Sequence, residues 1–367
     1  MATKIAVGDA RRMLKLLPND FANCAVTSPP YWKLRDYHAG PGEIGQEPTL
    51  QEYIDNLMAV IDEIYRVLAP HGTFFLDLGD SYVGNEATFI NGTELARKSL
   101  CLIPYRIAIS MADRGWIIRN VIIWHKPDCT PESMQDRFTV DFEPVFLCVK
   151  SSNYYFKRQL RPYSAKTLER CQRYIANGES FDPARHKCDP DRPSQAPMNV
   201  LGHFAKNMMV PGRTIHTMHL NRANGNNQDV FDPNGANMRC VQRISTAGYH
   251  GPHFAPFPEE LVQICIDAGC PPGGRVLDPF LGSGTSGIVA ERMGMDFYGI
   301  ELNPEYARLA TDRILTARAK RISTLHGTRA GSPKDGSVVE STVDGGLIVG
   351  EELDRACLDT ASQELLP

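Results

Sequence analysis

The chain has 367 residues, 42% of them hydrophobic and 22% charged, which is typical of globular proteins and enough for one large domain or two ordinary ones. No apolar run approaches about eighteen residues and the first residues lack a signal peptide's apolar core, so we expect a cytoplasmic protein without a membrane segment. The ten cysteines include no CxxC pair, which favours reduced, buried thiols and argues against a metal site.

Charge is unevenly distributed along the chain. Residues 151–250 hold fourteen Lys and Arg against seven Asp and Glu, a local net charge of +7 in a chain whose total is −4, so the remainder carries −11. A basic segment inside an acidic protein is expected of a surface that binds a polyanion. A solvated basic loop is the simpler alternative.

The first 150 residues alternate strand-like and helix-like patterns. Apolar residues recur at helical spacing in 49–68, where Thr49 and Glu52 form a capping pattern and Pro70 to Gly72 are expected to end the helix. A second helix is predicted at 100–114. The predicted strands are 4–7, 22–28, 72–80, 117–126 and 143–150.

Residues 151–250 lose this rhythm and are rich in Arg, Asn, His and Pro, which indicates a functional insertion. Regular patterns then return. Helices are predicted at 258–270, 286–294 and 303–322, the last with Asn303 as its N-cap and Pro304 in its first turn, and strands at 274–280 and 296–302. Strands alternating with helices predict a mostly parallel sheet covered on both faces.

The stretch "VLDPFLGSGT" (276–285) predicts a nucleoside-binding turn. Gly282 and Gly284 allow a tight turn and the close approach of a ligand to main-chain N–H groups, after a strand that ends at Asp278. Glu301, at the end of the next strand, is placed to accept hydrogen bonds from a ribose. Gly287 is one residue out of register for a dinucleotide fingerprint, which disfavours a nicotinamide dehydrogenase.

The stretch "TSPPYW" (27–32) places two prolines and two aromatic residues directly after an apolar strand. Prolines fix the backbone and have no N–H, so they present a carbonyl in a set direction. Taken alone, the pattern is also consistent with a rigid turn that has buried aromatic side chains.

Together these motifs resemble a known family. "DPFLGSGTSGIVAERMG" and "YGIELNPEY" look like the S-adenosylmethionine-binding half of amino-group DNA methyltransferases, and "SPPY" looks like their catalytic tetrapeptide of Asp, Asn or Ser, then Pro-Pro and an aromatic residue. The catalytic motif comes first, the basic segment second and the cofactor motif last, as in the circularly permuted β group. "GDARRMLKLLP" and "HFAPFPEELVQICIDAGCPPGG" resemble that group's flanking segments.

The resemblance covers about residues 5–150 and 250–320, and it implies an α/β fold of the class I S-adenosylmethionine-dependent (Rossmann-like) type, circularly permuted. It implies a catalytic half at 1–150, a target-recognition region at 151–250 and a cofactor-binding half at 251–321. The tail at 322–367 remains without a role.

The resemblance also implies which residues hold S-adenosylmethionine. Asp9 would bind the adenine amine and Glu301 the ribose, while the methionine part would lie against Phe257, Pro258, Phe280, Gly282 and Gly284. The implied cofactor-binding residues are Asp9, Phe257, Pro258, Asp278, Phe280, Gly282, Gly284, Thr285, Glu301 and Asn303.

The implied catalytic residues are Ser28, Pro29, Pro30 and Tyr31. An exocyclic amine is a poor nucleophile because its lone pair is delocalised into the ring, so acceptors on its N–H groups (the Ser28 hydroxyl and the Pro29 carbonyl) help to aim that lone pair at the methyl group. Tyr31 offers a face for stacking. The base must first be rotated out of the duplex.

Serine at the first position resembles cytosine-N4 enzymes, and aspartate resembles adenine-N6 enzymes, so we expect cytosine with adenine as the alternative. Arginine suits guanine and Asn or Gln suits adenine in the major groove. Candidate DNA-contacting residues are Trp32, Trp124, Lys126, Arg213, Arg222, Asn224, Gln228, Arg239 and Arg243, of which Trp124 is equally consistent with a core position.

The sequence therefore predicts a site-specific methyltransferase that acts on double-stranded DNA, either alone or beside a cognate restriction endonuclease. Methyl transfer to RNA or to a protein glutamine is less well supported because of the permuted order and the basic insertion. A non-catalytic DNA-binding scaffold has no need of the cofactor motif. The recognition sequence and the oligomeric state stay open.

Overall fold

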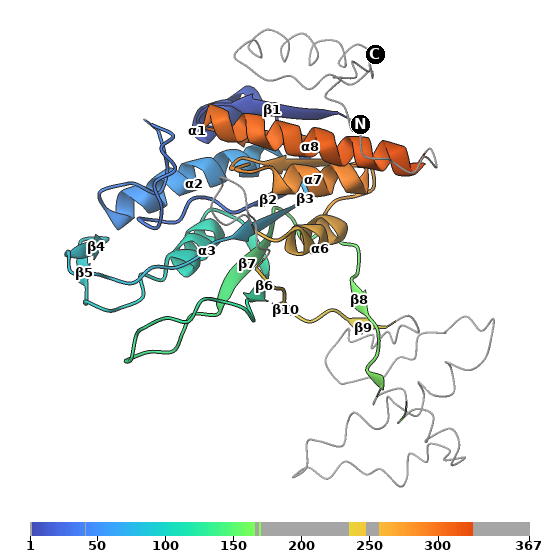
Figure 1. Ribbon diagram of the computed structural model, residues 1–367. Helices are drawn as coiled ribbons and strands as arrows, with labels where there is room; N and C mark the ends of the chain where they lie inside the picture. Colours follow the sequence, from blue (N-terminus) through green and yellow to red (C-terminus); the bar gives the residue numbers. More distant parts are fainter. Residues whose placement is uncertain (1, 41, 166–168, 170–234, 247–256, 326–367) are drawn as a thin grey trace, which may run out of the picture. The chain divides into compact units, whose positions relative to one another are not determined.

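The computed structural model describes residues 2–40, 42–165, 169, 235–246 and 257–325 (Figure 1). The chain divides into two compact units, of which the smaller spans Arg158–Arg239 and the larger is formed by the chain on either side of it. The described part of the smaller unit contains a short antiparallel pair, β8 (Leu160–Arg161) with β9 (Ala236–Asn237). This unit covers a shorter stretch of sequence than the insertion predicted at 151–250.

The larger unit is built on one eight-stranded sheet in which β7 alone runs antiparallel to its neighbours. The predicted mostly parallel sheet is therefore confirmed. In spatial order the strands are β1 (Thr3–Val7), β12 (Asp296–Glu301), β11 (Arg275–Asp278), β2 (Ala22–Thr27), β3 (Leu68–Asp77), β7 (Phe142–Val149), β6 (Ile117–His125) and β10 (Val241–Arg243).

Strands from the two ends of the chain interleave in this sheet. Leu277 of β11 pairs with Ala25 of β2, and Val7 of β1 pairs with Glu301 of β12. The carboxyl ends of these four strands and of β3 therefore meet at one edge of the sheet, where ligands bind in open α/β folds. Strand β10 was not predicted, and its place beside β6 explains why the inserted unit ends at Arg239, before residue 250.

Helices cover both faces of the sheet (Figure 1). Consecutive residues Phe74 and Phe75 of β3 belong to opposite cores, as strand alternation requires. The first core includes α2 (Leu50–Val67) and α3 (Ile103–Asp113), with α1 (Ala10–Met13) and the 3₁₀ turn η1 (Leu14–Leu16) beside them. The second includes α6 (Glu259–Gly269), α7 (Thr285–Met293) and α8 (Pro304–Leu325). A small hairpin, β4 (Thr88–Ile90) with β5 (Thr93–Leu95), adjoins α2.

Two predicted caps are present, and the predicted helix at 49–68 is confirmed to within one residue at each end. Thr49 and Glu52 form the expected capping box on α2, and the Asn303 side chain accepts a hydrogen bond from Glu305 N at the start of α8. Helix α2 ends at Val67, and β3 (Leu68–Asp77) begins earlier than the strand predicted at 72–80. No described helix is long and apolar enough to span a membrane, and the described residues contain no cluster able to hold a metal ion.

Candidate active site

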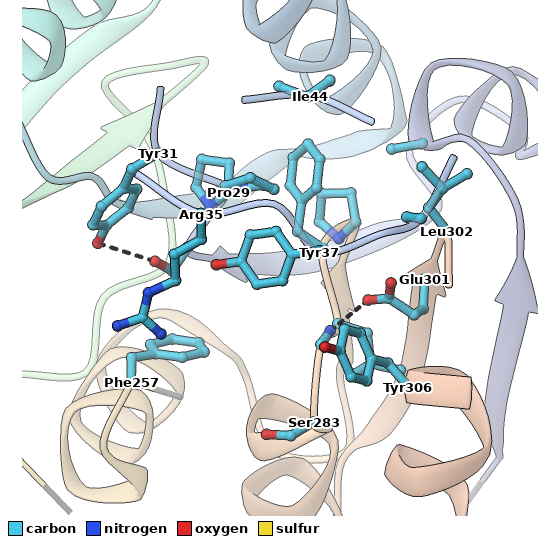
Figure 2. Close-up of a pocket in the computed structure, with 18 of the residues that line it drawn as sticks. Pro29, Tyr31, Arg35, Tyr37, Ile44, Phe257, Ser283, Glu301, Leu302 and Tyr306 are labelled. Carbon is cyan, nitrogen blue, oxygen red and sulfur yellow. Dashed lines mark hydrogen bonds between the residues drawn. The ribbon is translucent and has the colours of Figure 1, made fainter. Parts of the chain in front are cut away.

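A cavity of about 300 Å³ opens at the carboxyl edge of the sheet in the larger unit. Ser28 and Tyr31, which follow β2, line it together with Gly282 and Glu301 from the other end of the chain. Figure 2 shows Tyr31 and Pro29 on one side, Glu301 and Tyr306 on the other, and Tyr37 between them. The two sequence motifs thus meet in one cavity, as predicted.

Glu301 is fixed at the cavity wall by two backbone donors. Its Oε2 accepts from Gly282 N at 2.7 Å and its Oε1 from Asn303 N at 2.9 Å. Burial raises the pKa of Glu301 to about 7, against the effect of these hydrogen bonds. Gly282 has a φ of 53°, in the left-handed region, and its turn brings the N–H to the carboxylate. Each carboxylate oxygen keeps a lone pair for a ligand hydroxyl.

Four of the predicted cofactor residues are not among those that line the cavity: Pro258, Asp278, Gly284 and Asn303. Asp278 is fully buried and accepts hydrogen bonds from the Thr27 hydroxyl, Phe280 N and the Ser286 hydroxyl, so it shapes the turn. Burial raises the pKa of Asp278 to about 6. Gly284 packs against Ala310 of α8, where a Cβ would lie 2.9 Å from the Ala310 Cα. Gly284 is not among the residues that line the cavity, and its role at the methionine part of the donor stays a prediction.

Asp9 lines the cavity near Glu301, since the preceding Gly8 N donates to Glu301 O at 2.9 Å, and it caps α1. Its carboxylate accepts from Arg11 N at 2.9 Å and from Arg11 Nη2 at 2.7 Å. Burial acts to raise the pKa of Asp9, but the hydrogen bonds and charge of Arg11 hold it below its usual value. The carboxylate is therefore ionised and held in one orientation.

A segment between the two prolines and α2 covers the cavity, and the sequence analysis missed it. Glu43 organises this roof by accepting from Tyr37 N at 2.7 Å and from Ala39 N at 2.9 Å. Asn303 Nδ2 donates to Tyr37 O at 3.3 Å, and the Tyr37 and Tyr306 rings meet edge to face at 6.5 Å. The roof residues that line the cavity are Leu34, Arg35, Tyr37, Ala39, Gly42, Glu43 and Ile44.

The Ser-Pro-Pro-Tyr corner is joined to a chain of polar side chains. Ser28 Oγ lies 3.3 Å from Tyr31 Oη, and Tyr31 Oη donates to Glu143 Oε2 at 3.1 Å. Lys126 Nζ pairs with Glu143 Oε1 at 2.5 Å and lies 4.3 Å from the centre of the Trp124 ring. Burial, with Asp77 and Glu143 nearby, raises the pKa of Tyr31 well above its usual value, so the phenol keeps its proton.

Asp77 also lines this part of the cavity, and sequence reasoning missed it. The residue is 2% exposed, and among the described residues neither carboxyl oxygen has a hydrogen-bond partner. Burial and the Glu143 carboxylate raise the pKa of Asp77 well above its usual range, whereas Lys126 and the Ser28 hydroxyl act in the opposite direction. Burial therefore favours the protonated form of Asp77 more than it would be favoured in an exposed aspartate.

Comparison with known proteins agrees with this geometry. Residues 22–312 match the N6/N4 methyltransferase family, described as DNA methylase. The chain belongs to this DNA methylase family. The methylase is 34% identical over 331 residues to the Type II methyltransferase M.SmaI of Serratia marcescens, a match that covers 86% of this chain and 91% of the relative.

Two further likenesses are informative. The Type II methyltransferase M.SfiI of Streptomyces fimbriatus is 31% identical over 372 residues, covering 82% of the methylase and 88% of the relative. The structure of PvuII DNA methyltransferase, described as cytosine-N4-specific, aligns with a TM-score of 0.52 over 89% of this chain and 94% of its own. At 17% identity, this last likeness shows the fold alone.

The candidate DNA-contacting residues of the methylase have different surroundings. Trp32, a candidate for DNA contact, is buried and its Nε1 donates to Glu47 O at 3.1 Å, so it belongs to the core. Trp124 and Lys126 line the cavity, and Trp124 is also buried, with its Nε1 donating to Ile244 O. Arg239 and Arg243 are exposed. The remaining candidates, Arg213, Arg222, Asn224 and Gln228, lie outside the described residues.

Proposed function

We propose that this methylase transfers a methyl group from S-adenosylmethionine to the exocyclic N4 amine of a cytosine rotated out of duplex DNA. The N6 amine of adenine is the alternative target. One observation carries the proposal: the Ser-Pro-Pro-Tyr corner and the Gly282–Glu301 pair line the same cavity of about 300 Å³.

The residues at the Glu301 end fit S-adenosylmethionine. Glu301 offers acceptors for ribose hydroxyls, Asp9 is an ionised acceptor at the cavity wall, and Phe257 and Phe280 supply apolar surface. When bound there, the donor supplies a methyl group already activated by its positive sulfur. The protein therefore has mainly to align the acceptor and exclude water.

The corner at the other end fits an amino group. Ser28 Oγ and the Pro29 carbonyl can accept from its two N–H bonds, which draws the nitrogen lone pair out of the ring. Tyr53 donates to Pro30 O at 2.9 Å and so fixes the backbone beside the Pro29 carbonyl. Rotating the base into this corner costs a few kcal/mol of stacking and pairing.

Asp77 fits the ring atom next to the amino group. A protonated carboxyl can donate one hydrogen bond to a ring nitrogen. Both cytosine and adenine carry an unprotonated ring nitrogen beside the amine, so this contact serves either base. Cytosine is favoured here by serine at position 28, which resembles the N4 enzymes.

The macromolecular substrate follows from the family. The relatives M.SmaI and M.SfiI are named Type II methyltransferases, which supports duplex DNA as the substrate and a restriction-modification setting. The basic region between residues 151 and 250 is proposed to read the target sequence. A cognate restriction endonuclease that acts on the same site stays a prediction.

Product analysis tests the proposal. The protein is incubated with a methyl-labelled donor and native bacterial DNA, the DNA is digested, and the labelled nucleoside is identified. We expect N4-methylcytosine from the wild type and almost none from Ser28→Ala, which should still bind the donor. N6-methyladenine would establish the alternative base. Label in RNA or protein glutamine but none in DNA would contradict the proposal.

A further inference from the structure

A row of four polar side chains runs along the cavity wall from the Ser28 hydroxyl. Ser28 is followed by Tyr31, Glu143 and Lys126, with separations of 3.3, 3.1 and 2.5 Å between successive polar atoms. We infer that Glu143 and Lys126 are positioning residues that set the direction of the hydrogen bonds in this row, so that Ser28 faces the substrate amine as an acceptor. The inference rests on the proposed methyl transfer.

At the Lys126–Glu143 end of the row, the hydrogen bonds can run in only one donor-to-acceptor direction. The Lys126 ammonium is a donor only, so the Glu143 carboxylate that it contacts accepts from it and from Tyr31 Oη. The Lys126 and Glu143 side chains are 18% and 16% exposed, so solvent screens the ion pair little. Glu143 is the carboxylate that the Lys126 ammonium contacts, whereas Asp77 has no cation at hydrogen-bonding distance and its pKa is raised by burial.

Tyr31 carries this direction to the corner. The phenol has a single proton, and that proton is donated to Glu143 Oε2. The contact between Ser28 Oγ and Tyr31 Oη admits either atom as the donor. Because the Tyr31 proton is already committed to Glu143, Ser28 is the donor in this contact and Tyr31 Oη the acceptor.

The direction decides what Ser28 offers the substrate. A free hydroxyl can turn its proton towards the cavity and donate to a ring nitrogen, which would leave the amine without its acceptor. With its proton held by Tyr31, Ser28 presents lone pairs to the cavity and can accept from the amine N–H. An ionised carboxylate at this position would accept from the amine in any orientation. A serine accepts in the same way only when its own proton is donated elsewhere.

The substitution Glu143→Gln should reverse the direction of the hydrogen bonds in the row. A glutamine at position 143 turns its carbonyl to Lys126 and its NH₂ to Tyr31, so Tyr31 must donate to Ser28 and the Ser28 proton turns into the cavity. We expect kcat for DNA methylation to fall about a hundredfold, a size similar to the loss of one transition-state hydrogen bond. The KM for S-adenosylmethionine should change by less than about twofold, because Glu301 is untouched.

A double-mutant cycle separates this role from a structural one. Tyr31→Phe removes the acceptor of the Ser28 proton, and we expect kcat to fall about tenfold because Ser28 can then rotate. In that background Glu143→Gln should have no further effect beyond about twofold, since no connection to Ser28 remains. Glu63→Gln, which alters another ion-paired glutamate (2.8 Å from Arg66 in α2), is the matched control and should leave kcat unchanged.

The outcomes are distinct. Wild-type methylation of duplex DNA with non-additive losses at positions 31 and 143, and with thermal melting curves similar to wild type, supports the inference. Full additivity, or a Glu143→Gln enzyme as fast as wild type, overturns it and leaves the proposed function standing. A wild-type protein that methylates no DNA overturns both.

Discussion

Gly79 lies directly against the ring of Tyr31, the aromatic residue of the catalytic corner. A Cβ on residue 79 would lie 2.4 Å from Tyr31 Cε2 and 2.7 Å from Cδ2, closer than real Cβ atoms approach. Gly79 follows β3 by two residues, and Tyr31 follows the neighbouring strand β2. The Tyr31 ring thus occupies the space that a side chain at residue 79 would need.

We therefore predict that Gly79→Ala displaces Tyr31 and lowers kcat for methylation by at least about tenfold, since positions off by about 1 Å already cost strongly in aligned reactions. Donor binding, measured by titration calorimetry, should stay near wild type because Glu301 is at the other end of the cavity. Gly84→Ala is the control, since nothing lies within 4 Å of its Cβ position. Equal activity of the two variants would contradict the prediction.

Donor binding should depend on the ionisation of Glu301. With the pKa at about 7, the carboxylate becomes protonated as the pH falls, and the protonated form loses acceptor capacity for the ribose hydroxyls. We expect the affinity for S-adenosylmethionine to weaken about tenfold from about pH 8 to about pH 6. Glu301→Gln should bind more weakly at every pH but lose this dependence. A wild-type profile as flat as that of the variant would rule out Glu301 as the titrating group.

The buried carboxyls predict how stability changes with pH. The pKa of Asp77 is raised well above 3.8 and that of Asp278 to about 6, so the folded protein holds protons that the unfolded chain releases. Unfolding is then favoured as pH rises, and stability should fall from about pH 4 to about pH 6 and beyond for as long as Asp77 titrates.

Asp77→Asn tests this dependence. Neither Asp77 oxygen has a hydrogen-bond partner in the described part of the chain, so the amide should replace the carboxyl without loss of contacts. We expect a flatter curve and a melting temperature above that of wild type at about pH 8. Asp278→Asn should instead destabilise, because Asp278 accepts from Thr27, Phe280 N and Ser286. Parallel melting curves for wild type and Asp77→Asn across this pH range would contradict the assignment.

Local patterns in the sequence were enough for the two motifs and several helix ends. Asp278, Glu301 and Asn303 lie where a strand ends or a helix begins, and such positions carry strong residue preferences. The sequence also predicted that the motifs after β2 and β11 would lie together, because the carboxyl ends of parallel strands share one edge of the sheet.

Glu143 shows what the sequence left out. Glu143 is the second residue of β7 and so lies at the amino end of its strand. In parallel sheets the functional residues usually follow the carboxyl ends of the strands. Because β7 is antiparallel, its beginning lies at the cavity edge, with Glu143 opposite Trp124 of β6. No local pattern specifies that reversal. The adjacent residues Tyr31 and Trp32 could not be told apart from the sequence either. Tertiary packing places the Tyr31 ring at the cavity and buries Trp32.

Gly284 is predicted to support folding and, in contrast to Gly282, is not among the residues that line the cavity. Residue 284 has a φ of 86°, and its Cβ would meet Ala310 of α8 at 2.8 to 2.9 Å. Gly284→Ala therefore combines backbone strain with overpacking and should destabilise by about 2–4 kcal/mol. Gly273→Ala shares a positive φ of 72° but has nothing within 4 Å, so it should lose only about 1–2 kcal/mol. Chemical denaturation measures both. Equal losses would mean that the contact with Ala310 adds nothing, and that α8 moves to accept a methyl group.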